Sequence, residues 1–185
     1  MRRILLLFLL SVPSVAVMCQ AADRLPARPK HDVRLPFVAE AVLPGMRMNV
    51  SDGCDLVAFA KRFLGCPYAY GATGPDRFDC SGFTQFVFSA AGLKIPRMTE
   101  SQYLQGMPIE RIRDMRPGDL VFFTGSDLSN TWGHVGIVVS VAPDGGSFKF
   151  IHAANRGVTV DDSTTAYYRE RYVGCSRIPL FVNCK

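Results

Sequence analysis

Asp79-Cys80-Ser81-Gly82-Phe83 places a thiol where a short loop is expected to become a helix. The preceding stretch 68–75 is punctuated by glycines and a proline and cannot form regular structure. From Phe83 to Ala91, apolar residues recur at helical spacing. A cysteine in the first turn of a helix meets unpaired backbone N–H groups and the positive end of the dipole, which favour the thiolate. The sequence therefore predicts that Cys80 is a nucleophile with a lowered pKa.

Two of the three histidines stand in β-like runs that follow this cysteine. His134 begins the β-branched run 134–141, and His152 lies near the end of the run 148–153. A cysteine followed by two spaced histidines can supply the nucleophile, the base and an orienting residue of a cysteine hydrolase. The third histidine, His31, lies among scattered charges and prolines, and we interpret it as a solvated linker residue.

Hydrophobic periodicity changes along the chain from helical to strand-like. Helices are predicted over 52–64, over 80–92 and from Thr99, where Thr-Glu-Ser-Gln forms a capping box, to Gly106. Strands are predicted over 120–123, 134–141, 148–153 and 172–178, with a hairpin loop at 144–146. Helices followed by antiparallel strands indicate an α+β fold.

Strand parity places the two histidines on one face but too far apart for a hydrogen bond. A three-residue loop at 144–146 sets His152 opposite Val138, which is four residues along the strand from His134. At the rise of a β-strand this separation is about 13 Å. A bulge or a longer loop must close the gap, and the sequence leaves open which one does.

Residues 1–22 have the pattern of an export signal. Arg2-Arg3 forms a basic region, an apolar run begins at Ile4, and the small residues 21–22 offer a cleavage site. The apolar run is shorter than the roughly 20 residues that a membrane-spanning helix needs. We therefore expect no membrane span and an exported protein that acts in the periplasm or cell envelope. Lipidation of Cys19 is the alternative outcome.

The remainder is long enough for one hydrophobic core and not for two. Residues 23–50 contain four prolines and are interpreted as an arm or linker, and residues 51–185 as the domain. Loss of Arg2 and Arg3 leaves 19 basic and 16 acidic residues, so the net charge falls from +5 to +3. Because no lysine- or arginine-rich run occurs, we expect no nucleic-acid partner, and we expect a monomer.

Apart from Cys19, five cysteines occur in the chain, namely Cys54, Cys66, Cys80, Cys175 and Cys184. An odd number suits one free thiol with up to two disulfides. A helix between Cys54 and Cys66 would hold their Cα atoms about 18 Å apart, which argues against that bridge. Cys175 can pair with Cys184 if the chain turns between them, and the pairing stays open. No CxxC or HExxH spacing occurs, so we expect neither a metal nor another cofactor.

Six segments in this order resemble the NlpC family of bacterial cell-wall cysteine peptidases. They are Leu-Gly-Cys-Pro-Tyr-Ala-Tyr-Gly at 64–71, Asp-Cys-Ser-Gly-Phe at 79–83, Pro-Arg at 96–97, Pro-Gly-Asp-Leu-Val-Phe-Phe at 117–123, His-Val-Gly-Ile-Val at 134–138 and Ile-His-Ala at 151–153. The resemblance covers roughly residues 52–180. It implies a papain-like α+β domain, with N-terminal helices packed on an antiparallel β-sheet. It also implies hydrolysis of peptidoglycan stem peptides, usually between the γ-carboxyl of D-glutamate and a diamino acid.

The resemblance further implies roles for individual residues. Cys80 matches the nucleophile, His134 the general base and His152 the polar residue that orients the base. Tyr68 matches a tyrosine whose hydroxyl helps to bind the oxyanion.

Three more residues are candidates for substrate binding. Asp79 and Ser81 match positions that hold the free amine of the stem peptide in some members, although Asp79 can also act only as a helix cap. Trp132 can line the substrate groove or cover the core, and the sequence does not decide between them.

Two other functions compete with the endopeptidase. One is a related cell-wall amidase or acyltransferase that uses the same cysteine and histidines. The other is a catalytically silent wall-binding module. The presence of all three polar catalytic residues argues against the silent module.

Overall fold

The computed structural model describes residues 53–125, 128 and 132–179 of the 185-residue chain. The export signal at 1–22 and the arm at 23–50 lie outside the described residues, as do Cys19, His31 and Cys184. The predictions that concern them therefore stay predictions.

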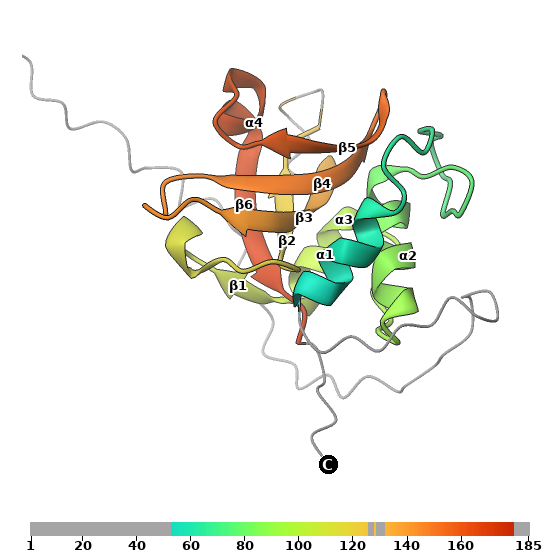
Figure 1. The fold of residues 1–185 in the computed structure, drawn as a ribbon, viewed down its shortest axis with the longest axis horizontal. Helices are drawn as coiled ribbons and strands as arrows, with labels where there is room; N and C mark the ends of the chain where they lie inside the picture. The colour runs from blue at the N-terminus through green and yellow to red at the C-terminus, as the bar shows by residue number, and fades with distance from the viewer. Residues whose placement is uncertain (1–52, 126–127, 129–131, 180–185) are drawn as a thin grey trace, which may run out of the picture. The chain divides into compact units, whose positions relative to one another are not determined.

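The described residues form an α+β fold, as predicted (Figure 1). The helices are α1 (Gly53–Lys61), α2 (Cys80–Ala90), α3 (Thr99–Gln105) and the short α4 (Ala166–Arg171), with a 3-10 turn at Ile112–Asp114. The strands are β1 (Met107–Ile109), β2 (Leu120–Phe123), β3 (His134–Val141), β4 (Phe148–Ala154), β5 (Gly157–Asp162) and β6 (Tyr172–Arg177). All their pairings are antiparallel, and the order across the sheet is β1-β6-β2-β3-β4-β5.

Three elements were not predicted, and two predicted helix ends were wrong. The unpredicted elements are β1, β5 and α4, each of six residues or fewer. The capping box at Thr99 does not form, because Met98 is the N-cap and Thr99 is already a buried residue of α3. The first helix ends at Lys61 instead of residue 64, and turns continue to Gly65, whose φ is 83°.

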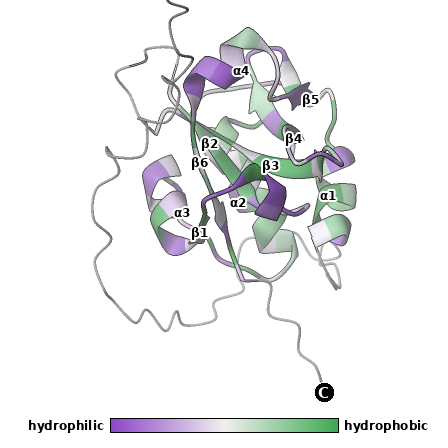
Figure 2. Cartoon of the chain, turned by 90° about the vertical axis from the view of Figure 1, so that its left-hand side faces the viewer, coloured by the Kyte–Doolittle hydropathy of each residue, from purple (hydrophilic) through white to green (hydrophobic). Residues whose placement is uncertain are grey.

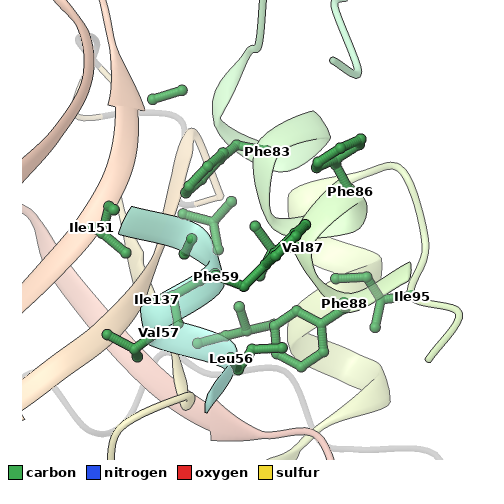
Figure 3. Close-up of a cluster of buried hydrophobic side chains, with 14 of the residues drawn as sticks. Leu56, Val57, Phe59, Phe83, Phe86, Val87, Phe88, Ile95, Ile137 and Ile151 are labelled. Carbon is green, nitrogen blue, oxygen red and sulfur yellow. The ribbon is translucent and has the colours of Figure 1, made fainter. Parts of the chain in front are cut away.

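The main core lies between the helices and one face of the sheet. Helices α1 and α2 pack against each other and against β3 and β4. Figure 3 shows Phe59 of α1 beside Phe83 and Val87 of α2, with Ile137 and Ile151 facing them from the strands. The fully buried aromatic and branched side chains of this cluster fix α2, and with it Cys80, against the sheet.

A second, smaller core covers the opposite face of the sheet. In β2, Leu120 and Phe122 belong to the first cluster, whereas Val121 and Phe123 belong to the second. Alternating strand residues point to opposite faces, so the sheet is buried on both sides. Hydrophobic residues accordingly continue along the central strands in Figure 2. Helix α4 contributes Tyr168 to this second core.

A buried carboxylate joins the turn before β2 to the far end of the chain. Asp119 is 2% exposed and accepts hydrogen bonds from Nε of Arg177 at 2.7 Å and from its Nη2 at 2.8 Å. The same carboxylate accepts the backbone N–H of Arg116 at 2.7 Å. These charge-assisted bonds hold β2 and β6 side by side.

No disulfide joins two of the described cysteines. Cys54 is exposed, Cys66 and Cys80 are half-buried, and Cys175 is buried in the second core. No bridge joins Cys54 to Cys66. Pairing of Cys175 with Cys184 lies outside the described residues. Within the described part of the chain, no helix has the length and apolar content needed to cross a membrane.

Candidate active site

Asp79 organises the start of α2. One carboxylate oxygen accepts the backbone N–H of Gly82 at 2.7 Å, and the other accepts that of Gly71 at 2.8 Å. The predicted N-cap is therefore present, and the same residue fixes the preceding loop. A Cβ at Gly82 would lie 2.2 Å from the carbonyl oxygen of Ala72, so only glycine lets this loop approach the first helical turn.

The thiol of Cys80 does not have the lowered pKa that the sequence predicted. Burial raises its pKa, and the negative charge of Asp79 adds to the rise. Backbone hydrogen bonds from Ser81 and Val135 oppose these effects but are smaller. The prediction was wrong because it considered the helix start and not the burial of the sulfur. The thiol therefore keeps its proton at neutral pH and needs a base to remove it.

The hydrogen bond from Val135 also places a candidate base near the thiol. Val135 is the second residue of β3, directly after His134, and α2 and β3 pack against each other. The start of the helix that bears the cysteine thus lies beside the start of the strand that bears the first histidine.

The structure brings the two histidines together. Nε2 of His134 lies 2.7 Å from Nδ1 of His152, which is within hydrogen-bonding distance. A longer loop and a bulge, the two alternatives left open by the sequence, together bring the histidines close. The loop is one residue longer than expected, because Val141 pairs with Phe148, and the register shifts again between Val138 and Ser140.

The resulting register places His152 next to Gly136 instead of Val138. Ile137 pairs with Ile151, and a Cβ at Gly136 would lie only 3.1 Å from the Cβ of His152. About 7 Å of strand then separates the two histidine positions, a distance that two imidazole side chains can span.

His152 lies at the centre of a polar cluster inside the second core. Its side chain is fully buried, and its Nε2 is 2.9 Å from Oδ2 of Asp161 on β5. The hydroxyl of Tyr168 donates to the same oxygen at 2.8 Å, and Arg156 pairs with the other oxygen. Sequence reasoning missed all three neighbours. The alternation in Gly157-Val-Thr-Val-Asp-Asp was the available signal for β5 and hence for Asp161.

Burial makes both imidazoles neutral. It lowers the pKa of His134 from 6.5 to about 3, with a further contribution from His152 and opposition from Asp161. It also lowers the pKa of His152. Hydrogen bonds from His152 and Tyr168 hold the pKa of Asp161 well below its usual value, so this carboxylate is ionised.

Tyr68 lines a cavity of about 660 Å³ together with His134, Asp161 and Tyr168. This volume is within the range of roughly 300–1,000 Å³ that is typical of ligand sites. Burial raises the pKa of the Tyr68 hydroxyl, and Cys80 and Asp79 raise it further. The hydroxyl therefore stays protonated and can donate a hydrogen bond.

The candidate amine-binding residues already have a cationic partner. Arg97 donates from Nη1 to Oγ of Ser81 at 2.6 Å and pairs with Asp79 through Nη2. An incoming ammonium group must therefore share these acceptors with the guanidinium.

Trp132 is half-buried and packs against the main core. Its ring centroid is 4.4 Å from that of Tyr103 and 6.0 Å from that of Phe122. Of the two alternatives for Trp132, covering the core is the one with observed contacts. Among the described residues, no group of three His, Cys, Asp or Glu side chains could hold a metal ion.

The NlpC/P60 family model matches residues 65–177, and the chain belongs to this family. It is 40% identical over 124 residues to a probable endopeptidase p60 of Listeria innocua, which covers 66% of this chain and 24% of that protein. It is 33% identical over 125 residues to a gamma-D-glutamyl-L-lysine dipeptidyl-peptidase of Bacillus cereus, covering 66% of this chain and 35% of that protein. The chain thus spans about a quarter to a third of these two relatives.

The fold agrees with this assignment. The crystal structure of an NlpC/P60 family protein from Bacillus cereus matches with a TM-score of 0.59 and 31% sequence identity. The match covers 68% of this chain and 40% of that one. The resemblance drawn from the six sequence segments is therefore confirmed, as is the α+β domain that it implied.

We expect that Gly136→Ala separates the two histidines. The added Cβ would lie 2.8 Å from Cδ2 of Phe150 and 3.1 Å from the Cβ of His152, so one of these buried side chains must shift. Unfolding experiments should show a loss of about 1–3 kcal/mol, and kcat on a stem peptide should fall by about tenfold or more. Gly146→Ala is the control, since its nearest contact would be an ordinary 3.4 Å. Equal kcat in the two variants would contradict this account.

The low pKa of His134 predicts activity in mildly acidic solution. The base must be neutral, and protonation at a pKa of about 3 instead of 6.5 leaves it neutral as the pH falls below 6.5. The acid limb of kcat/KM should therefore lie well below pH 6.5. Folding stability should decrease over the same interval, because the unfolded histidines take up protons below about pH 6.5 and the folded ones do not. Rates are therefore corrected for the folded fraction; an acid limb at or above 6.5 would contradict the prediction.

Proposed function

We propose that this chain is an exported cysteine endopeptidase that hydrolyses peptide bonds in peptidoglycan stem peptides. The observation that carries the proposal is the hydrogen bond between His134 and His152 at the start of β3, beside the start of the helix that bears Cys80. Membership of the NlpC/P60 family supports the class of substrate. We assign Cys80 as nucleophile, His134 as base and His152 as the residue that orients the base.

The reaction begins with two neutral partners. His134 removes the thiol proton as the sulfur of Cys80 attacks the carbonyl carbon, and the electrons of the carbonyl move to its oxygen. Backbone N–H groups at the start of α2 and the protonated hydroxyl of Tyr68 stabilise this oxyanion. The C–N bond then breaks, the amine takes the proton from His134, and a thioester remains on Cys80. His134 next removes a proton from water as the water oxygen attacks the thioester carbonyl. The C–S bond then breaks, which releases the acid, and the proton passes from His134 to the sulfur, which restores the thiol.

The bond between the γ-carboxyl of D-glutamate and a diamino acid is our choice for the cleaved bond. The relative from Bacillus cereus is named for action at a gamma-D-glutamyl-L-lysine bond. The family model's match at 65–177 contains the residues assigned here. Action on this bond in peptidoglycan agrees with export through residues 1–22 into the periplasm or cell envelope. A second peptidoglycan chemistry, transfer of the same acyl group to another amine, would use the same thioester.

The proposal predicts a definite order among active-site variants. Cys80→Ala should abolish hydrolysis without unfolding the domain, and His134→Ala should be nearly as inactive. His152→Asn should retain more activity than His134→Ala, because an amide oxygen can still accept a hydrogen bond from the base. The measurement is kcat/KM on a synthetic stem peptide, with circular dichroism to monitor folding.

Digestion of purified peptidoglycan, followed by mass analysis, identifies the cleaved bond. Fragments that end in D-glutamate would support the choice, and fragments cut elsewhere would replace it. Cys54→Ala is a suitable control, since this exposed thiol lies in α1. Hydrolysis by Cys80→Ala at the wild-type rate would refute the proposal, and wall binding without hydrolysis by the wild type would favour the silent module.

We further propose that Asp79 and Ser81 bind the free amine of the stem peptide. Asp79 can do so through a charge-assisted hydrogen bond only if Arg97 yields part of its carboxylate. We also keep Trp132 as a proposed residue of the groove wall, because it is half-buried and not fully covered by the core.

The free-amine proposal predicts that N-acetylation of a tripeptide substrate raises KM. Acetylation removes the positive charge that Asp79 would bind, so kcat/KM should fall about tenfold, as expected for loss of one charge-assisted hydrogen bond of about 1.5 kcal/mol. Equal rates on the free and acetylated peptides would remove Asp79 and Ser81 from this role. A third peptide with an N-methyl amine, which keeps the charge, controls for bulk.

A further inference from the structure

We infer that Asp161 is a positioning residue, which acts through His152 to make Nδ1 of His134 the basic atom. This inference rests on the proposed function, since it concerns the same reaction. It adds a residue from β5 to the cysteine and two histidines that sequence reasoning identified.

Asp161 determines which nitrogen of His152 carries the hydrogen. Asp161 accepts the hydroxyl hydrogen of Tyr168 and pairs with Arg156, as an ionised carboxylate does. A carboxylate without a proton can only accept, so Nε2 of His152, at 2.9 Å from Oδ2, must be the donor. Because this imidazole is buried and neutral, its Nδ1 then has no hydrogen.

The hydrogen on His152 determines where His134 carries its own hydrogen. Nδ1 of His152 is an acceptor, so Nε2 of His134, at 2.7 Å, must carry the hydrogen. A neutral His134 with a hydrogen on Nε2 has its lone pair on Nδ1. This lone pair is the one that can take the proton of Cys80.

Without the carboxylate the chain of donors can reverse. His152 could then carry its hydrogen on Nδ1 and donate to Nε2 of His134, which would move the second hydrogen to Nδ1. His134 would keep the same position and still be unable to accept the thiol proton. Asp161 therefore selects one of two arrangements that share a single geometry.

The surroundings of Asp161 hold it in this role from two sides. Tyr168 comes from α4, and Arg156 comes from the turn between β4 and β5. The Asp161 side chain is only 15% exposed, while its neighbour Asp162 accepts hydrogen bonds from the backbone N–H and hydroxyl of Thr164. Asp162 thus offers a matched carboxylate on the same strand that has a different partner.

The direct test reads the histidine hydrogens in the full chain by long-range ¹H–¹⁵N NMR. We expect hydrogen on Nε2 of both His134 and His152 in the wild type and in Asp162→Asn. In Asp161→Asn, we expect a mixture of the two forms or hydrogen on Nδ1. Hydrogen on Nδ1 of His152 in the wild type would overturn the inference, whatever the enzyme does to peptidoglycan.

The kinetic test asks whether Asp161 acts through His152. Asp161→Asn should lower kcat on the stem peptide about 10- to 100-fold with little change in KM, an effect of the size seen when a metal-bound histidine loses its outer hydrogen-bonding partner. In a His152→Asn background the same substitution should change kcat by less than about twofold, because the two residues act in series. Equal losses in both backgrounds would assign Asp161 a purely structural role.

Two controls keep the outcomes separate. Thermal unfolding shows whether Asp161→Asn folds. If it does not fold, Tyr168→Phe replaces it, because this change removes one donor to Asp161 and keeps the ring. Tyr168→Phe should lower kcat severalfold when His152 is present and not in the His152→Asn background. If the wild type cleaves no stem peptide, the proposed function fails while the NMR result still stands. If the wild type cleaves it and Asp161→Asn does so at the same rate, only the inference about Asp161 fails.

Discussion

The 2.7 Å hydrogen bond between His134 and His152 imposes the strictest condition on this domain, because it joins residues whose strand positions would otherwise lie far apart. Three features of the sheet serve it together. The hairpin is one residue longer than its sequence suggests, β3 contains a register shift, and Gly136 leaves the space that the His152 side chain needs. Each feature either interrupts the regular hydrogen bonding between the strands or removes a side chain that could pack. All three features lie within the hairpin of β3 and β4. Such local disruptions are typical of strands that position active-site residues.

Burial determines the protonation states of the thiol and the two imidazoles in the site. Cys80, at the positive end of a helix, would be expected to ionise, yet burial and Asp79 raise its pKa, while burial lowers the pKa of His134. In the proposed reaction, the resting pair is therefore a thiol and a neutral imidazole, and charge separates only as the reaction begins. Asp161 then lies two hydrogen bonds from the developing imidazolium. Its negative charge opposes the effect of burial on both histidines, so the residue proposed to order the hydrogens would also stabilise the charged intermediate.

The sequence predicted the parts of this site that depend on local chemistry. The helix start at Cys80, the N-cap Asp79, the strands that begin at His134 and Phe148 and the six family segments follow from spacing and residue type alone. The sequence showed that a bulge or a longer loop must bring the histidines together, but it did not show which, because a bulge has no reliable signature in a single sequence. Asp161 and Tyr168 were missed for a different reason: β5 and α4 are short, and the contact between Tyr168 and Asp161 depends on how α4 folds back over β5. The pKa of Cys80 was wrong because burial is a property of the whole fold.

The position of the site between two hydrophobic cores explains why such short elements matter. The main core fixes α2 and thus Cys80, whereas the second core, on the other face of the sheet, surrounds His152 with Phe150 and Tyr168. Cys80 and His152 are therefore held by different cores, and β3 with His134 lies between them. A small shift of the sheet relative to either core would change the distance between sulfur and base. The short helix α4 contributes to the second core and to the hydrogen bonds of Asp161 through one residue, Tyr168, so packing and proton positions on that side of the site depend on the same side chain.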